Sequence, residues 1–174
     1  MAKDVNAMSV RLKRLSPDDG RDVYDMLQEI PNDENGFRNF ILGEPYEAYR
    51  RWLAEEDAFS RSTQVVDGWR APTTTFWLYD GDTPVGMGKL RHFLTDRLRE
   101  GGGHVGYCVR PSCRGKGYSR LLLSALAGEA RAMNLGSLLI TVFEGNEPSL
   151  RTALSCGAKL ERTANGRHYL WLDC

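Results

Sequence analysis

Apolar residues in the first sixty positions recur with two spacings, one typical of strands and one typical of helices. They alternate with polar residues over 9–15, which predicts an edge strand. The Ser-Pro-Asp-Asp run from Ser16 is typical of a helix start, because serine caps, proline suits the first turn and acids favour the positive end. Pro45 opens a second predicted helix. The predicted buried stripes are Val23, Met26, Leu27 and Ile30 in the first helix, and Tyr49, Trp52, Leu53 and Phe59 in the second.

Loops and antiparallel strands are predicted to follow. Residues 32–43 form a polar segment whose few apolar side chains could pack or could cover a ligand. Residues 60–74 are predicted to be a loop, either a substrate-side flap or simply a mobile segment. Strand-like composition at 75–79 and 83–90, with Asp80-Gly81 between the two runs, predicts a tight hairpin. The stretch 95–103 carries charged residues and then three glycines, and it is predicted to be a linker.

The last forty residues predict two further kinds of pairing. A continuous apolar run at 137–142 is typical of a strand that helices cover on both faces. The short helix after it is expected to end near Gly157 in a left-handed cap. Lys159–Arg162 and His168–Asp173 are predicted to pair about an Asn165-Gly166 turn. The whole order contains about seven strands and four helices, which predicts one mixed α/β domain without internal repeats.

The stretch 103–133 predicts a strand, a glycine-rich loop and a helix. Arg114–Ser119 forms the loop, where glycines allow close backbone approach and the first helical turn leaves amide hydrogens unpaired. With its two basic side chains, such a loop can bind a phosphate or a diphosphate, although a loop that only turns the chain has the same composition. Two nucleotide motifs are excluded, because Gly117 stands where a P-loop has Ser or Thr, and Arg120 stands where a dinucleotide fingerprint has glycine.

The run from Tyr107 to Ser119, Tyr-Cys-Val-Arg-Pro-Ser-Cys-Arg-Gly-Lys-Gly-Tyr-Ser, resembles the acyl-CoA-binding motif of the GNAT superfamily of N-acyltransferases. That motif places Arg or Gln first, then two variable residues, Gly, a variable residue, and Gly or Ala. Arg114 and Gly117 match it, and Ser119 is a small departure. Residues 90–107 resemble one predicted-acetyltransferase branch of the superfamily. The resemblance covers most of the chain from about Trp77 onward.

The resemblance implies a GNAT-like fold, with a mostly antiparallel central sheet and one splayed parallel strand pair. It implies that 1–72 supplies the acceptor side and that 73–174 forms the acyl-CoA-binding core. Acetyl-CoA would be the acyl donor, with its pantetheine arm in the gap between the strands, and a small-molecule or peptide amine would be the acceptor. The implied cofactor-binding residues are Tyr107, Cys108, Val109, Arg110, Arg114, Gly115, Lys116, Gly117, Tyr118, Ser119, Asn146 and Ser149. For Asn146 and Ser149, ordinary helix capping is an equal alternative.

The acid and the base of such a reaction are not evident. Many relatives use a tyrosine where this chain has Ala153, or a glutamate where it has Gly103. The residues that remain nearby are His104, His92, Tyr107, Tyr118 and Glu144. His104, His92 and Tyr107 are taken as the candidate catalytic residues, and histidine titrates in the useful range. A histidine in such a strand is more often a packed residue, and water acting as the base is an equal alternative. The missing pair also leaves open a non-catalytic acyl-CoA sensor or interaction module.

Composition adds weaker expectations. Lys and Arg total 23 and Asp and Glu total 23, so no net field favours nucleic acid. The sequence has no run of about 20 apolar residues and no apolar signal core near Met1–Asn6, so no membrane association and a cytoplasmic location are expected. The four cysteines lack Cys-x-x-Cys spacing, so free thiols and no metal site are expected. Exposed carboxy-terminal strands are expected to be able to join two subunits in a homodimer.

Overall fold

The computed structural model describes residues 9–174. The amino-terminal stretch that lacks an apolar signal core lies outside the described residues. Nine strands, five α-helices and one short 3-10 helix (Pro111–Cys113) make up the described chain. In chain order they are β1 (Val10–Arg14), α1 (Arg21–Leu27), β2 (Asp33–Glu34), β3 (Phe37–Arg38), α2 (Tyr46–Ser60), β4 (Thr73–Asp80), β5 (Thr83–Arg91), α3 (Asp96–Glu100), β6 (Val105–Val109), α4 (Tyr118–Ala132), β7 (Ser137–Phe143), α5 (Glu147–Ser155), β8 (Lys159–Ala164) and β9 (Arg167–Asp173).

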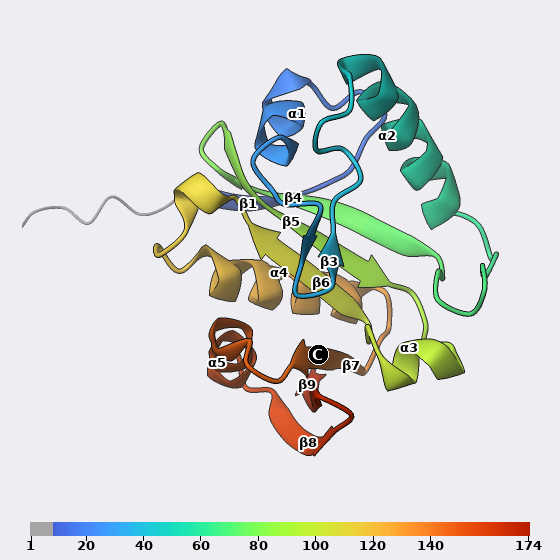
Figure 1. Cartoon of the computed structure of the whole chain (residues 1–174), viewed down its shortest axis with the longest axis vertical. Helices are drawn as coiled ribbons and strands as arrows, with labels where there is room; N and C mark the ends of the chain where they lie inside the picture. Colours follow the sequence, from blue (N-terminus) through green and yellow to red (C-terminus); the bar gives the residue numbers. More distant parts are fainter. Residues whose placement is uncertain (1–8) are drawn as a thin grey trace, which may run out of the picture.

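Two antiparallel sheets form the centre of the molecule (Figure 1). The first has the order β1-β4-β5-β6 and the second has the order β7-β9-β8. Leu12 opposite Leu78 sets the register of β1 on β4, and Gly88 opposite Tyr107 sets that of β5 on β6. The connection from β6 through α4 to β7 carries the chain from the first sheet into the second.

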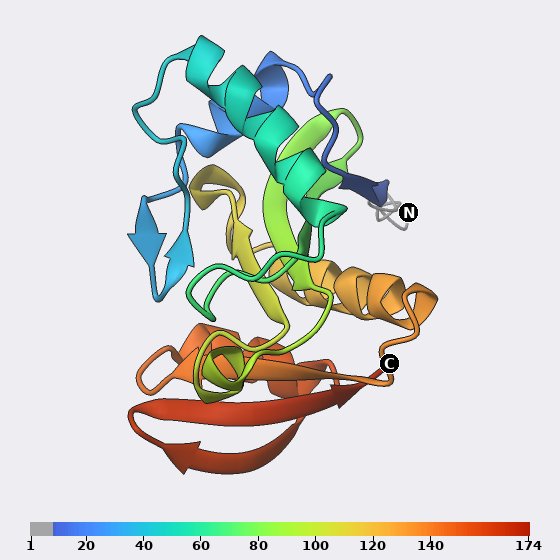
Figure 2. The same ribbon diagram turned by 90° about the vertical axis from the view of Figure 1, so that its right-hand side faces the viewer.

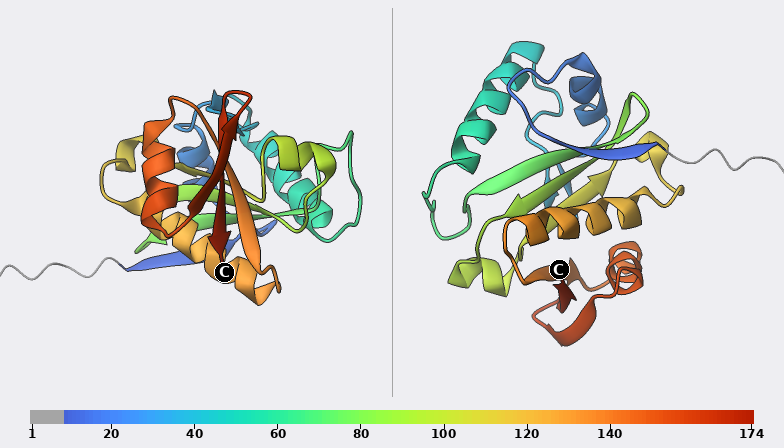
Figure 3. Two further views of the ribbon diagram at one scale, coloured as in Figure 1. Left: turned by 90° about the horizontal axis from the view of Figure 1, so that it is seen from below. Right: turned by 180° about the vertical axis from the view of Figure 1, so that it is seen from behind.

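Helices cover both faces of the four-stranded sheet. Helices α1 and α2 lie on one face and α4 lies on the other (Figure 3, right). Gly88 of β5 lets α4 approach closely, because a Cβ there would stand 2.9 Å from Leu126. The α4 face joins the second sheet in one hydrophobic core that includes Leu122 and Leu170. Trp77 and Tyr49 are fully buried in a separate core under α1 and α2.

Strands β6 and β7 do not pair in the described chain, although they are neighbours at one end. There the amide of His104 donates to the carbonyl of Leu139 at 2.8 Å, and the amide of Leu139 donates to Nδ1 of His104 at 2.8 Å. Beyond this link β6 belongs to the first sheet and β7 to the second. The expected mixed α/β fold with a mostly antiparallel sheet and a splayed strand pair is therefore confirmed.

The predicted start of the first helix at Ser16 is wrong, because α1 begins only at Arg21. The buried carboxylate of Asp19 accepts hydrogen bonds from the amide of Ser16 at 2.8 Å and from Nε1 of Trp77 at 2.6 Å. These bonds close a turn over 16–19 and hold it against β4. A contact across 58 residues therefore overrides the local helix-start pattern.

A hairpin of two short strands and one short helix were missed, which explains why the described chain has more than seven strands and four helices. Residues 32–43 contain the hairpin β2–β3, whose turn residues Asn35 and Gly36 have φ of 52° and 84°. The hairpin stands beside β6 (Figure 2). The expected linker 95–103 contains α3, which Thr95 caps by accepting a hydrogen bond from the amide of Leu98 at 3.1 Å.

The cysteines and helices bear on three compositional expectations. All four cysteines are free, as expected. Within residues 9–174 no helix has the length and apolar character needed to cross a membrane. The same residues contain no group of three or more His, Cys, Asp or Glu side chains that could hold a metal ion.

Candidate active site

The loop between β6 and α4 has the backbone shape expected of an anion receptor. Gly115 and Gly117 have φ of 80° and 83°, in the left-handed region that favours glycine. No atom lies within 4 Å of the position that a Cβ would take at either glycine. Packing within the chain therefore does not require these glycines. The backbone conformation and the approach of a ligand remain as their uses.

The main-chain amides of this loop point to the same use. Within the described chain, the amides of residues 115–119 donate no hydrogen bond to a carbonyl or a side chain. Five successive unpaired donors at the start of the fifteen-residue helix α4 are suited to an anion with several oxygens, and the helix dipole favours negative charge at that end.

The basic side chains around the loop differ in availability. Arg110 donates to Glu29 at 2.6 Å, and Ser112 also donates to Glu29 at 2.6 Å. The hydrogen bond from Arg110 is the main cause that lowers the pKa of Glu29 to about 2. Arg114 donates to the carbonyl of Val109 at 3.1 Å and to Glu34 at 2.6 Å. Arg110 thus ties the turn that follows α1 to the loop, and Arg114 ties the loop to the hairpin β2–β3.

Three further side chains near the loop differ in exposure and contacts: Lys116, Tyr118 and Cys108. Lys116 is exposed. Tyr118 is buried and its hydroxyl donates to Asp80, so only its amide can face a ligand at the loop. Cys108 is buried too, and burial raises the pKa of its thiol, which disfavours a thiolate nucleophile there.

Hydroxyl groups meet on the other side of the gap between β6 and β7. The hydroxyl of Tyr107 lies 3.0 Å from Oγ of Ser149 on α5. Oγ of Ser119, in the first turn of α4, lies 3.2 Å from Oγ1 of Thr152. Asn146 precedes α5, but its side chain makes no cap hydrogen bond. The fold thus brings Tyr107, Ser119 and Ser149 together, and it leaves the Asn146 amide without the capping role that was its alternative.

His104 is held at the junction of the two sheets. It is buried, and its Nδ1 accepts the hydrogen bond from the amide of Leu139, so a neutral ring carries its proton on Nε2. Burial, followed by the charges of Arg99 and Arg91, lowers the pKa of His104 to about 4. In this arrangement His104 can donate a hydrogen bond, but it cannot take a proton at Nδ1 without breaking the link to β7.

His92 lies at the end of β5, outside the gap between β6 and β7. Its Nε2 is 2.8 Å from Oγ1 of Thr74, and its amide donates to the carbonyl of Pro72. Burial, with a smaller effect of Arg14, lowers its pKa. The fold therefore does not bring His92 to the tyrosine and serine groups at the gap.

The two positions where relatives carry an acid or a base are closed in this chain. Gly103 has φ of 59°, and a Cβ there would stand 2.4 Å from the carbonyl oxygen of Leu139. Ala153 is fully buried in the main core. Neither position can hold a larger side chain in this backbone. The absence of the tyrosine and the glutamate that many relatives carry therefore agrees with the packing of this chain.

Sequence reasoning missed Glu34, Thr152 and Lys89 as residues around the site. Glu34 lies next to the Asn35-Gly36 turn, and this turn signal could have placed it on a hairpin. Thr152 and Lys89 follow no motif, and only the packing of α5 and of the hairpin brings them to the site.

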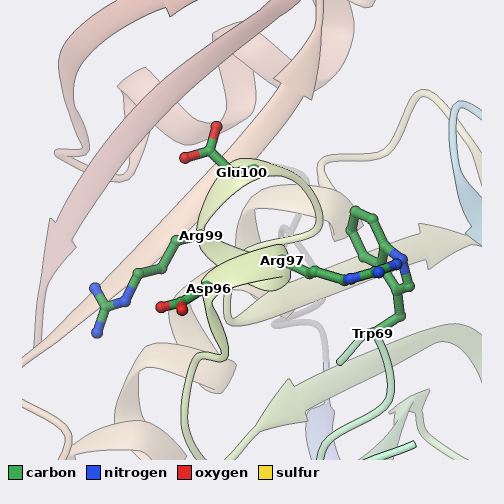
Figure 4. Close-up of a pocket in the computed structure, with 5 residues that line it drawn as sticks. All are labelled: Trp69, Asp96, Arg97, Arg99 and Glu100. Carbon is green, nitrogen blue, oxygen red and sulfur yellow. The ribbon is translucent and has the colours of Figure 1, made fainter. Parts of the chain in front are cut away.

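A separate surface pocket lies between α3 and the loop that precedes β4. It has a volume of about 460 Å³ and is lined by Trp69, Asp96, Arg97, Arg99 and Glu100. The side chain of Arg97 extends to Trp69, whose ring centroid is 5.7 Å from the guanidinium carbon (Figure 4). No residue predicted to bind the cofactor lines this pocket.

Residues 24–158 match the acetyltransferase (GNAT) family, and the chain belongs to that family. No curated protein sequence matches this chain.

Solved structures show the same fold at low identity. The GNAT domain of S. lividans PAT is 14% identical with a TM-score of 0.64, over 95% of this chain and 90% of that one. The dodecameric spermidine N-acetyltransferase of Vibrio cholerae is 13% identical with a TM-score of 0.63, over 94% and 93%. The putative acetyltransferase yncA of Salmonella typhimurium, solved with acetyl-CoA, is 15% identical with a TM-score of 0.57, over 95% and 94%.

Proposed function

We propose that the protein transfers an acetyl group from acetyl-CoA to a primary amine by direct attack in a ternary complex. The single observation that carries the proposal is the row of five unpaired amides at residues 115–119 beside open space at both loop glycines. The cofactor diphosphate occupies this row, and the pantetheine arm lies between β6 and β7. Residues 73–174 form this cofactor core, and residues 1–72 supply the acceptor side.

In the reaction the neutral amine nitrogen attacks the thioester carbon. The tetrahedral intermediate then collapses, the carbon–sulfur bond breaks, and the thiolate takes a proton. Main-chain amides of β6 near Val109 polarise the carbonyl, and positioning of the two substrates supplies much of the rate. In this proposal the amine loses its extra proton to water.

Tyr107 is the best placed proton donor to the leaving thiolate. Its hydroxyl lies at the start of α5, the end of the gap where the thiol is expected, and Ser149 orients it. Burial raises the pKa of Tyr107, so its hydroxyl is protonated at neutral pH. His104 has a positioning role in this proposal, because it fixes the end of the gap rather than facing the thiol.

A non-catalytic acyl-CoA sensor is the second candidate, and the closed positions Gly103 and Ala153 favour it. Turnover separates the two functions. The protein is incubated with acetyl-CoA and a broad panel of primary amines, free CoA is measured over time, and products are identified by mass. Sustained CoA release with an acetylated amine supports the enzyme, and tight acetyl-CoA binding without turnover supports the sensor.

The copies are proposed to form a homodimer through β8, the outer strand of the second sheet. Its Leu160 is 53% exposed, and an unpaired strand edge can extend a sheet between subunits. Analytical ultracentrifugation of the wild type and Leu160→Glu tests this, with a dimer expected only for the wild type.

A further inference from the structure

Lys89 of β5 presents its ammonium group on the acceptor side of the sheet. Its neighbour Gly88 faces α4, because a Cβ at Gly88 would meet Leu126. Side chains alternate along a strand, so Lys89 faces the opposite side, where the hairpin β2–β3 lies. There Nζ donates to the carbonyl of Arg38 at 2.7 Å and lies 4.8 Å from the ring centroid of Phe37.

The charge of Lys89 has no carboxylate partner in the described part of the chain. All ion pairs within 4 Å among residues 9–174 use other cations. Glu56 is the one acid that acts noticeably on Lys89, but Arg70 already pairs with it at 2.8 Å. Arg91, two residues further along β5, adds a second positive charge without a carboxylate and donates to two carbonyls at 3.1 Å.

The surroundings therefore favour loss of a proton from Lys89. Desolvation is the main cause, Arg91 and Arg70 add repulsion, Glu56 and Cys108 oppose the effect, and the pKa of Lys89 falls to about 8. The charged groups of the hairpin do not change this balance, since Arg38 pairs with Asp33 at 3.6 Å and Glu34 pairs with Arg114. An anion supplied by a ligand would neutralise the excess positive charge.

Lys89 is also close enough to the expected thioester to contact an acceptor. It pairs with Gly106 of β6, and the ring of Phe37 from the hairpin lies against that glycine, 3.3 Å from the position that a Cβ would take. Cys108 and Val109 follow two and three residues later, which is about 7–10 Å along the strand. An amine at the thioester and a negative group at Lys89 can therefore belong to one small molecule, with several bonds between the two groups.

We propose that Lys89 binds the anionic group of the acceptor, so that the substrate is a small primary amine that also carries a carboxylate or a phosphate. The proposal rests on the proposed acetyl transfer and names its substrate class. A polyamine is excluded as a good substrate, because it would bring a second positive charge to Lys89 and Arg91.

Matched acceptors of one chain length test the proposal. Acetylation of 4-aminobutyrate, the neutral 4-aminobutanamide and the cationic 1,4-diaminobutane is compared, and 3-aminopropyl phosphate separates phosphate from carboxylate. The anionic amines are expected to have kcat/KM at least roughly tenfold above the amide, the gain expected of one charged hydrogen bond. Lys89→Met is expected to remove this preference, with a smaller loss on the amide than on the anionic amines, whereas Lys89→Arg retains it and Lys159→Met on exposed β8 is the unaffected control.

A binding measurement tests the same proposal without turnover. Calorimetry of 4-aminobutyrate and 3-aminopropyl phosphate at pH 8, with CoA present and in two buffers of different ionisation enthalpy, should show proton uptake by the wild type and none by Lys89→Met.

Several outcomes overturn the proposal. A preference for the diamine, or no binding of either anionic amine, would each overturn it. So would a loss of kcat/KM in Lys89→Met that is equal on all acceptors. A loss of kcat/KM on all acceptors in Lys89→Arg would indicate a proton-transfer role instead. Failure of acetyl-CoA itself to bind or turn over refutes the proposed function instead, and calorimetry of acetyl-CoA with the wild type identifies that case.

Discussion

Gly103 offers a quantitative test of how β6 and β7 are joined at one end. In Gly103→Ala the new Cβ would stand 2.4 Å from the carbonyl oxygen of Leu139, so β7 or the start of β6 must shift. The shift disturbs both hydrogen bonds between His104 and Leu139, each 2.8 Å long. Each bond contributes about 1 kcal/mol, and the left-handed φ of 59° costs a non-glycine residue about 1 kcal/mol more.

Gly81→Ala is the matched control. Gly81 has nearly the same backbone, with φ of 57°, and no atom lies within 4 Å of its Cβ position. We expect urea denaturation to show a loss of about 3 kcal/mol or more for Gly103→Ala and about 1 kcal/mol for Gly81→Ala. The melting temperatures should fall by about 6–12 °C and about 2–4 °C, respectively. Equal losses in the two variants would refute the described junction. Gly103→Glu, which introduces the glutamate that many relatives carry here, should lose at least as much stability and should not gain acetyltransferase activity.

Three further predictions follow from the site. Gly117→Glu should abolish acetyl-CoA binding in calorimetry, since its carboxylate occupies the open space at the loop, whereas Gly117→Ala should weaken binding less. Unchanged affinity in Gly117→Glu would contradict the loop assignment. Tyr107→Phe should lower kcat by roughly 100-fold or more with little change in the KM for acetyl-CoA, and an unaltered kcat would remove Tyr107 as the acid. The pKa of His104 is about 4 in the folded state, below the ordinary 6.5, so stability should fall as pH falls from 6.5 to 4. By pH 4.5 we expect urea denaturation to show a loss of about 2–3 kcal/mol in the wild type that His104→Gln lacks. The same dependence of unfolding free energy on pH in both proteins would argue against a buried neutral ring.

Local backbone chemistry explains most of what the sequence predicted correctly. The Asn165-Gly166 hairpin and the left-handed Gly157 depend on neighbours in sequence, and both have positive φ as expected. The glycine-rich loop between β6 and α4 belongs to the same kind, because Gly115 and Gly117 carry their own conformational signal. The Asn35-Gly36 hairpin had an equal signal, but strands of two residues leave no apolar alternation to support it.

Long-range contacts explain what the sequence could not predict. Asp19 ends a turn rather than opening a helix because Trp77, far along the chain, donates to it. The ion pair of Arg114 with Glu34 spans 80 residues, and no spacing rule relates them. No motif in the sequence marks Lys89, and only the hairpin packed over it makes the environment of its charge unusual.

A crystal structure of the protein with CoA tests the central claim most directly. We expect the diphosphate oxygens to lie within hydrogen-bonding distance of the amides of residues 115–119, with the pantetheine arm between β6 and β7. A diphosphate bound elsewhere, or a gap closed by pairing of the two strands, would contradict it.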